Sequence, residues 1–135
     1  MERGRGNFVC CIVGDGTFLF SVPGSVWWVA RRYRIPVLTV VLNNNGWHAP
    51  RRSALLVHPH GLTASADPQE LGLSFTPSPD FAGIARAAAA GRLWTRKVGT
   101  VVGLKEVLDE AVRVMVDGGE DGEGNAGAVV EVLIG

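Results

Sequence analysis

Two oxygen-bearing side chains, those of Asp15 and Asn44, each follow an apolar run of the chain. Asp15 is the centre of a Gly-Asp-Gly turn after residues 8–13, and Asn44 is the second of two Asn residues after residues 37–42. If both runs are strands of one parallel sheet, their carboxyl ends lie at the edge where such sheets bind ligands. A carboxylate and a carboxamide are hard oxygen donors, which suit Mg²⁺ and the phosphates that often share its coordination shell. The pattern therefore predicts a magnesium site at this edge.

Either half of this pattern alone is ordinary turn chemistry. A Gly-Asp-Gly turn is common because Gly adopts backbone angles that other residues avoid, and an Asn-rich segment that ends in Gly is typical of turns. The halves gain meaning together, because 26 residues separate Gly16 from Asn43 and each half follows an apolar run. Such a motif is a hypothesis that its structural context must confirm.

The two halves and their spacing resemble the signature of thiamine diphosphate enzymes, in which Gly-Asp-Gly is followed at about this distance by Asn-Asn. Residues 14–23, 31–33 and 42–47 are similar to the acetolactate synthase-like and benzoylformate decarboxylase-like branch of that family. The match is densest over residues 14–53 and weaker beyond residue 80. It implies that the chain binds thiamine diphosphate.

The resemblance also implies which residues hold the cofactor. In the family, Mg²⁺ grips the diphosphate and is bound by the Asp carboxylate, the second Asn side chain and the carbonyl two residues later. The corresponding metal ligands here are Asp15, Asn44 and Gly46. Backbone N–H groups near the start of a helix attract phosphate, and the family uses the turn after the first strand for the diphosphate. The implied cofactor contacts are the three metal ligands with Gly14, Gly16 and Thr17.

The implied function is Mg²⁺-dependent binding of thiamine diphosphate within an acetolactate synthase-like enzyme. Such an enzyme cleaves or forms a carbon–carbon bond on a small 2-oxo acid and is a homo-oligomer. The cofactor is the nucleophile and electron sink, so no side chain is assigned a catalytic role. A 2-hydroxyacyl-CoA lyase or oxalyl-CoA decarboxylase is an alternative, because the third Asn of the second motif is followed by Gly. Trp47, the next residue, fits the acetolactate synthase-like branch better.

The length of the chain limits it to one domain. Residues 1–135 are expected to form a single, partial diphosphate-binding domain, whereas a complete enzyme of the family has several. The resemblance implies that an upstream strand and helix are missing, together with the domain that supplies the activating glutamate. The chain is therefore too short to be active alone. The alternative is a non-catalytic truncated fragment or interaction remnant, which would expose apolar area.

Composition argues against several classes of partner. The 13 basic and 13 acidic residues give a net charge of zero, which does not favour nucleic acid. No apolar stretch approaches the roughly 20 residues that span a bilayer, and the first residues lack the apolar segment of a secretory signal. We expect an intracellular protein of the cytoplasm, and import into an organelle stays open. Cys10 and Cys11 are adjacent on a predicted strand, so we expect buried free thiols rather than a disulfide.

Apolar runs alternate with helical patterns along the chain. Strands are expected at about residues 8–13, 37–42, 92–98 and 128–134, and helices at about 21–34, 81–90 and 101–116. The inner face of the first helix is expected to contain Val22, Val26, Val29, Ala30 and Tyr33. This alternation predicts an α/β fold of three layers, with a mostly parallel sheet and helices on both faces.

Two stretches lack such a pattern. Residues 43–80 form a long irregular segment, which is expected to be functional or partly disordered. Within it residues 54–57 fit either a short helix or a short strand, and Arg51 and Arg52 could meet a carboxylate substrate. Residues 117–127 are expected to form a flexible acidic loop.

Overall fold

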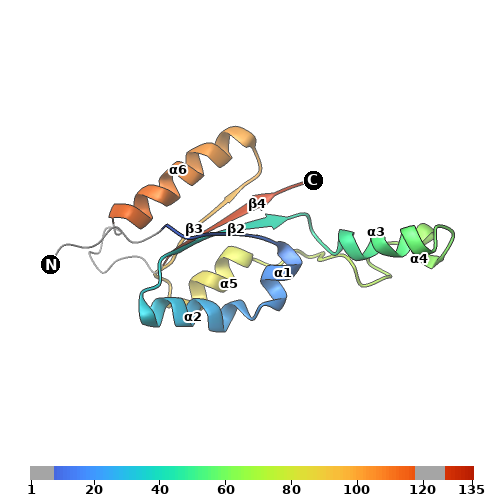
Figure 1. Cartoon of the computed structure of the whole chain (residues 1–135), viewed down its shortest axis with the longest axis horizontal. Helices are drawn as coiled ribbons and strands as arrows, with labels where there is room; N and C mark the ends of the chain where they lie inside the picture. Colours follow the sequence, from blue (N-terminus) through green and yellow to red (C-terminus); the bar gives the residue numbers. More distant parts are fainter. Residues whose placement is uncertain (1–7, 118–126) are drawn as a thin grey trace.

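A computed structural model describes residues 8–117 and 127–135 of the chain. Within these residues the strands form one sheet in the order β1-β2-β4-β3, and every neighbouring pair is parallel (Figure 1). The strands are β1 (Cys10–Gly14), β2 (Val37–Asn43), β3 (Trp94–Val98) and β4 (Gly127–Leu133). Because all are parallel, their carboxyl ends lie at one edge of the sheet.

Helices cover both faces of the sheet (Figure 1). One face carries α1 (Asp15–Phe20), α2 (Pro23–Tyr33) and α5 (Phe81–Ala88), and the other carries α6 (Val101–Asp117). Two further helices, α3 (His48–Val57) and α4 (Leu62–Ser65), project beyond the carboxyl edge of the sheet. The predicted α/β fold, with three layers and helices on both faces of a parallel sheet, is confirmed.

Two apolar clusters fill the space between the layers. The first lies between the sheet and the helices α2 and α5, and it includes Trp27, Phe81 and Val129. The second lies between the sheet and α6, and it includes Leu38, Ala111 and Val130. The residues of β2 and β4 alternate between the two clusters, so both faces of these central strands are buried. This explains why their sequences are almost continuously apolar.

The first strand differs from its expected burial. β1 is an edge strand that pairs only with β2 in the described sheet. Ile12 is 67% exposed, and Cys10 and Cys11 are exposed free thiols. The prediction of a buried strand with buried thiols is therefore wrong, because within residues 8–117 and 127–135 no strand or helix covers this side of β1.

The inner face of α2 also differs from the prediction. Its buried residues are Pro23, Trp27 and Ala30, whereas four of the five expected residues are exposed, namely Val22, Val26, Val29 and Tyr33. The apolar residues of this helix form two stripes, and Trp27 buries more surface than a valine can. The helix expected at residues 21–34 is present as α2, and α1, a short helix that was not predicted, precedes it.

The long segment after β2 contains helical structure. Residues 54–57 lie in the second half of α3, which settles the open choice in favour of helix. Neither α3 nor α4 buries a residue, and we call residues 48–66 the arm. Most of the predicted acidic loop, residues 118–126, lies outside the described residues. No helix in the described chain is long and apolar enough to cross a membrane.

Candidate functional site

The two predicted motifs meet at the carboxyl edge of the sheet. β1 and β2 are hydrogen-bonded neighbours, and Gly14 at the end of β1 lies opposite Leu42. The next residue after Gly14 is Asp15, and Asn44 follows the end of β2. The parallel pairing therefore delivers both side chains to the same edge, as the sequence predicts.

Asp15 joins the two motifs through its carboxylate. The residue is 4% exposed. Its Oδ1 accepts a hydrogen bond from the Gly16 N–H at 2.7 Å, and its Oδ2 accepts one from the Gly46 N–H at 3.0 Å. Within residues 8–117 and 127–135 no cationic side chain pairs with this carboxylate. A buried carboxylate whose hydrogen-bond partners are backbone N–H groups still favours a nearby cation.

Asn44 completes a group of three polar atoms. A terminal atom of its amide lies 3.2 Å from Asp15 Oδ2 and 2.9 Å from the carbonyl oxygen of Gly46. If that atom is nitrogen, the amide donates hydrogen bonds to both oxygens. If it is oxygen, three oxygens face one another, which is favourable only around a cation. The structure thus brings the three predicted metal ligands together.

A short stretch of chain, residues 73–75, holds the turn that carries these ligands, and we call it the strap. Trp47 N–H donates to the Leu73 carbonyl at 2.7 Å, and Phe75 N–H donates to the Asn45 carbonyl at 3.1 Å. Gly46 has a φ of +150° between these bonds, and a Cβ there would collide with the Leu73 carbonyl. Only glycine therefore fits this position comfortably.

Trp47 packs the turn against the first motif. Its ring lies edge-on to Phe20 and Phe75, with centroids 5.4 and 5.6 Å away. A Cβ on Gly16 would strike the same ring. The absence of a side chain at Gly16 therefore lets the two motifs approach each other closely.

The remaining turn residues lie at the border of the group. Gly14 and Thr17 are exposed, and the helix that follows, α1, has six residues. Gly14 has no side chain, and within the described residues the Thr17 side chain makes no hydrogen bond to Asn44 or Gly46. Only their backbone position near the edge links them to the site.

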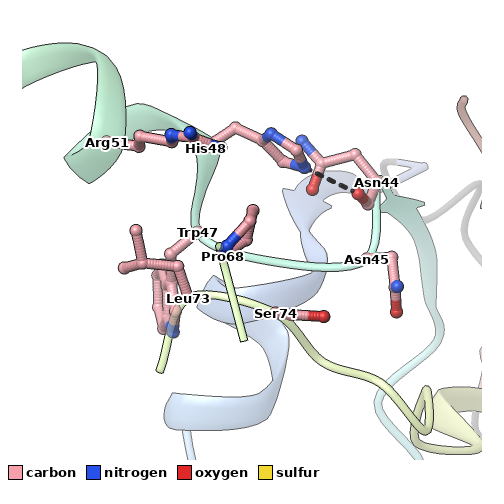
Figure 2. Close-up of a pocket in the computed structure, with 8 residues that line it drawn as sticks. All are labelled: Asn44, Asn45, Trp47, His48, Arg51, Pro68, Leu73 and Ser74. Carbon is pink, nitrogen blue, oxygen red and sulfur yellow. Dashed lines mark hydrogen bonds between the residues drawn. The ribbon is translucent and has the colours of Figure 1, made fainter. Parts of the chain in front are cut away.

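A hollow of about 230 Å³ lies beside Asn44 (Figure 2). It is lined by apolar side chains and by polar groups, namely Asn44, Asn45, Trp47, His48, Arg51, Pro68, Leu73 and Ser74. His48 Nε2 lies 2.9 Å from the Asn44 carbonyl oxygen, as the dashed line in Figure 2 marks. Of the two arginines noted in the sequence, Arg51 lines this hollow and Arg52 is exposed.

Two buried polar residues beneath the site were missed in the sequence. Asn43 and Glu131 are 4% and 0% exposed. Asn43 Oδ1 accepts a hydrogen bond from the Asn45 N–H at 2.9 Å, and its Nδ2 donates to Glu131 Oε1 at 2.8 Å. The available signal was a single acidic residue in the apolar run at residues 128–134.

Among the described residues, the side chains around Asp15, Asn44 and Gly46 do not form a metal site of clustered His, Cys, Asp and Glu residues. No cluster of three or more His, Cys, Asp or Glu side chains in the described part of the chain could hold a metal ion. A metal at this edge would instead depend on one carboxylate with amide and carbonyl oxygens. Such all-oxygen sets suit Mg²⁺ rather than softer transition metals.

Comparison with known proteins identifies the family. Residues 2–124 match the family described as thiamine pyrophosphate enzyme, C-terminal TPP binding domain. The chain therefore belongs to this family and is a thiamine diphosphate-binding domain. A comparison with curated proteins gave no match.

Two solved structures share the fold. One is described as a thiamin diphosphate-dependent enzyme from Mycobacterium smegmatis, with 24% identity and a TM-score of 0.60 over 97% of this chain and 19% of that one. The other is the thiamine diphosphate-dependent 4-hydroxybenzoylformate decarboxylase of Rhodococcus jostii RHA1, with 22% identity and a TM-score of 0.64 over 95% of this chain and 20% of that one. The chain spans about a fifth of the length of these proteins.

Proposed function

We propose that this domain binds thiamine diphosphate together with Mg²⁺, and that Asp15, Asn44 and Gly46 hold the metal. One observation carries the proposal, which is the approach of the Asn44 amide to Asp15 Oδ2 and to the Gly46 carbonyl oxygen at 3.2 and 2.9 Å. Neighbouring oxygens of an octahedral shell with bonds of about 2.0–2.1 Å stand about 2.9 Å apart. The residues present therefore fit a small, hard cation.

The charges at the site support the same assignment. The Asp15 carboxylate is buried, and its partners in the described chain are backbone N–H groups. The diphosphate of the cofactor is also negative, so a carboxylate without a cation would repel it. A divalent cation between the two removes this repulsion and ties the ligand to the sheet edge.

Each residue of the turn has a part in this proposal. Gly14, Gly16 and Thr17 border the diphosphate through their backbone, and Gly16 also lets Trp47 hold the two motifs together. When bound, thiamine diphosphate would supply a nucleophilic carbon and a cationic ring that accepts an electron pair. The residues of this chain bind and orient the cofactor.

Titration calorimetry with thiamine diphosphate tests the proposal. We expect binding with Mg²⁺ that disappears with a chelator, and we expect Asp15→Ala to remove the metal-dependent part. The matched control is Asp109→Ala, because Asp109 is an exposed residue of α6 on the far face of the sheet. Binding of equal strength in the chelator would show that the metal assignment is wrong.

We infer further that the parent enzyme is acetolactate synthase-like and acts on a small 2-oxo acid. The resemblance of the motifs supports this branch, and one structural neighbour is named as a 4-hydroxybenzoylformate decarboxylase. The 2-hydroxyacyl-CoA lyase or oxalyl-CoA decarboxylase branch is the alternative within enzymes. Trp47, which packs between Phe20 and Phe75, is the residue that favours the first branch.

Exposed apolar surface supports a role within a larger assembly, such as a homo-oligomer. β1 exposes Ile12 at 67%, and α2 exposes Val26 and Tyr33 at 51% and 65%. Exposed apolar side chains on an edge strand and on a covering helix fit a place where another segment or subunit packs. A non-catalytic fragment that serves only as an interaction surface is the alternative. It predicts partner binding that is unaffected by Asp15→Ala.

We do not expect the 135-residue chain to turn over 2-oxo acids by itself. The resembled enzymes need a glutamate from a second domain to activate the cofactor, and this chain spans only about a fifth of its structural neighbours. The assay is decarboxylation of pyruvate and benzoylformate with saturating cofactor and Mg²⁺. Multiple turnover that is lost in Asp15→Ala would contradict this expectation.

A further inference from the structure

Glu131 is the buried ionisable residue that the proposed binding site does not use. It occupies the middle of β4, opposite Val41 of β2 and Lys97 of β3. Its side chain is fully buried. The preceding residues of β4, Gly127 to Val130, are also buried, but none of them is charged. A carboxylate at such a position needs an explanation, because burying a charge costs far more than burying an apolar side chain.

The contacts of this carboxylate are uneven. Oε1 accepts hydrogen bonds from Asn43 Nδ2 at 2.8 Å and pairs with Lys97 Nζ at 2.9 Å. Oε2 has no hydrogen-bond partner among the described residues. A buried ion pair often contributes less stability than apolar residues of the same volume, and an unpartnered buried oxygen lowers it further. Stability therefore does not explain a glutamate at this position, and the hydrogen bond between Oε1 and Asn43 is the contact that does.

Oε1 holds the residue that shapes the metal-ligand turn. The amide nitrogen of Asn43 donates hydrogen bonds to Glu131 Oε1 and to Ser78 Oγ, and these bonds fix the direction of the amide oxygen. That oxygen accepts the Asn45 N–H at 2.9 Å. Asn45 lies between Asn44, whose amide approaches Asp15 Oδ2, and Gly46, whose carbonyl oxygen approaches that amide. A continuous line of hydrogen bonds thus runs from the core of β4 to the turn.

We propose that Glu131 is a positioning residue, which orients Asn43 so that Asn43 holds residues 44–46 in the shape that receives the cation. The meaning of that shape rests on the proposed function, whereas the line of hydrogen bonds does not. Partners beyond the direct ligands of a metal commonly change its affinity by about 10- to 100-fold when they are removed. Glu131 acts on Asn44 and Gly46 less directly, through Asn43 and the N–H of Asn45 between them.

Three variants of the whole chain test the proposal. Glu131→Leu removes the acceptor and keeps the volume apolar, and Glu131→Gln keeps an oxygen for Asn43. Val129→Ala is the matched control, since Val129 is fully buried two residues earlier on the same face of β4 and belongs to the apolar cluster. It weakens the core without touching Asn43.

The first readout needs no ligand. Hydrogen exchange of the Asn45 amide reports its bond to Asn43, and we expect Glu131→Leu to speed this exchange at least about 10-fold. Glu131→Gln should restore most of the protection, and Val129→Ala should leave it near the wild-type value under conditions where the chain stays folded. If Glu131→Leu leaves the Asn45 amide as protected as in the wild type, the positioning role is wrong.

The second readout is the Mg²⁺ concentration needed for half-maximal binding of thiamine diphosphate. We expect this concentration to rise about 10- to 100-fold in Glu131→Leu, and much less in Glu131→Gln and Val129→Ala. An equal rise in Val129→Ala would overturn the proposal, because the effect would then follow from stability alone. If the wild type shows no Mg²⁺-dependent binding while the exchange of Asn45 changes as expected, the proposed function fails and the positioning of the turn by Glu131 stands.

Discussion

The carboxyl edge of the sheet and the arm adjoin each other, but they are held in different ways. At the edge, the Asp15 carboxylate accepts hydrogen bonds from the N–H groups of Gly16 and Gly46. The strap accepts a backbone hydrogen bond from residue 47 and donates one to residue 45. In the arm, neither helix has a buried residue, and Leu56 and Leu62 are 85% and 83% exposed. The geometry of the proposed metal ligands therefore derives from the sheet and the strap, and the arm contributes the contact of His48 Nε2 with the Asn44 carbonyl oxygen.

The largest contrast is expected in stability. Phe81 is fully buried and packs edge-on to Phe18 at 6.0 Å, so Phe81→Ala should lower the free energy of unfolding by about 3–5 kcal/mol. Leu56→Ala, on the exposed side of the arm, should change it by less than about 0.5 kcal/mol. Urea unfolding of both variants measures the difference. Equal losses would show that the arm is packed as firmly as the core.

Gly46→Ala should damage the site and the fold together. The φ of +150° and the collision of a Cβ with the Leu73 carbonyl force the turn away from the strap, at a cost on the order of 1–3 kcal/mol. We expect Mg²⁺-dependent affinity for thiamine diphosphate to fall more than about 10-fold. Gly24→Ala is the matched control, because nothing lies within 4 Å of a Cβ there. Unchanged binding in Gly46→Ala would refute this account of the turn.

Asn44→Ala should affect binding without affecting stability. Asn44 is exposed, so its truncation should shift the free energy of unfolding by less than about 0.5 kcal/mol. Loss of a proposed metal ligand should still lower Mg²⁺-dependent affinity by about 10-fold or more. Its neighbour Asn45 is the control, since the Asn45 side chain donates to Thr76 Oγ1 and not to the metal group. Calorimetry of Asn44→Ala and Asn45→Ala separates the two, and similar losses would count against the assignment of Asn44.

The sheet and its order of elements could be predicted because the central strands are apolar on both faces. β2 was expected at residues 37–42 and is Val37–Asn43, and α6 was expected at residues 101–116 and is Val101–Asp117. The convergence of Asp15 and Asn44 followed from the same logic, since parallel neighbours end at one edge, whereas Gly46 was implied by the family resemblance. The cofactor role of these residues stays a prediction.

The parts that could not be predicted depend on tertiary neighbours. Periodicity did not show which of two apolar stripes of α2 faces the core, and Trp27 rather than the valines lies there. The apolar run of β1 did not reveal an exposed edge strand. Glu131 looked like an ordinary strand residue, because its partner Asn43 is 88 residues away in the sequence. A long-range contact of this kind has no local signature.

The smallest change in amide exchange and binding is expected for the hydrogen bonds that join α3 to α4 within the arm. Arg51 Nε and Nη2 donate to the carbonyls of Thr63 and Ala66, and both distances are 3.4 Å. These bonds are longer than the usual 2.7–3.2 Å range of roughly linear N–H···O bonds, so each holds α4 against α3 only weakly. Arg51→Met should therefore speed amide exchange in residues 62–66 by a few-fold and leave Mg²⁺-dependent binding within about two-fold.

Arg52→Met is the control for this prediction, because Arg52 is the adjacent exposed arginine of the same helix. Its variant should leave the exchange of residues 62–66 unchanged, since within the described residues no hydrogen bond links Arg52 to α4. A large loss of cofactor binding in Arg51→Met alone would mean that Arg51, which lines the hollow beside Asn44, contacts the ligand. In that case the arm would belong to the binding site, and the difference between the two regions would be one of rigidity and not of function.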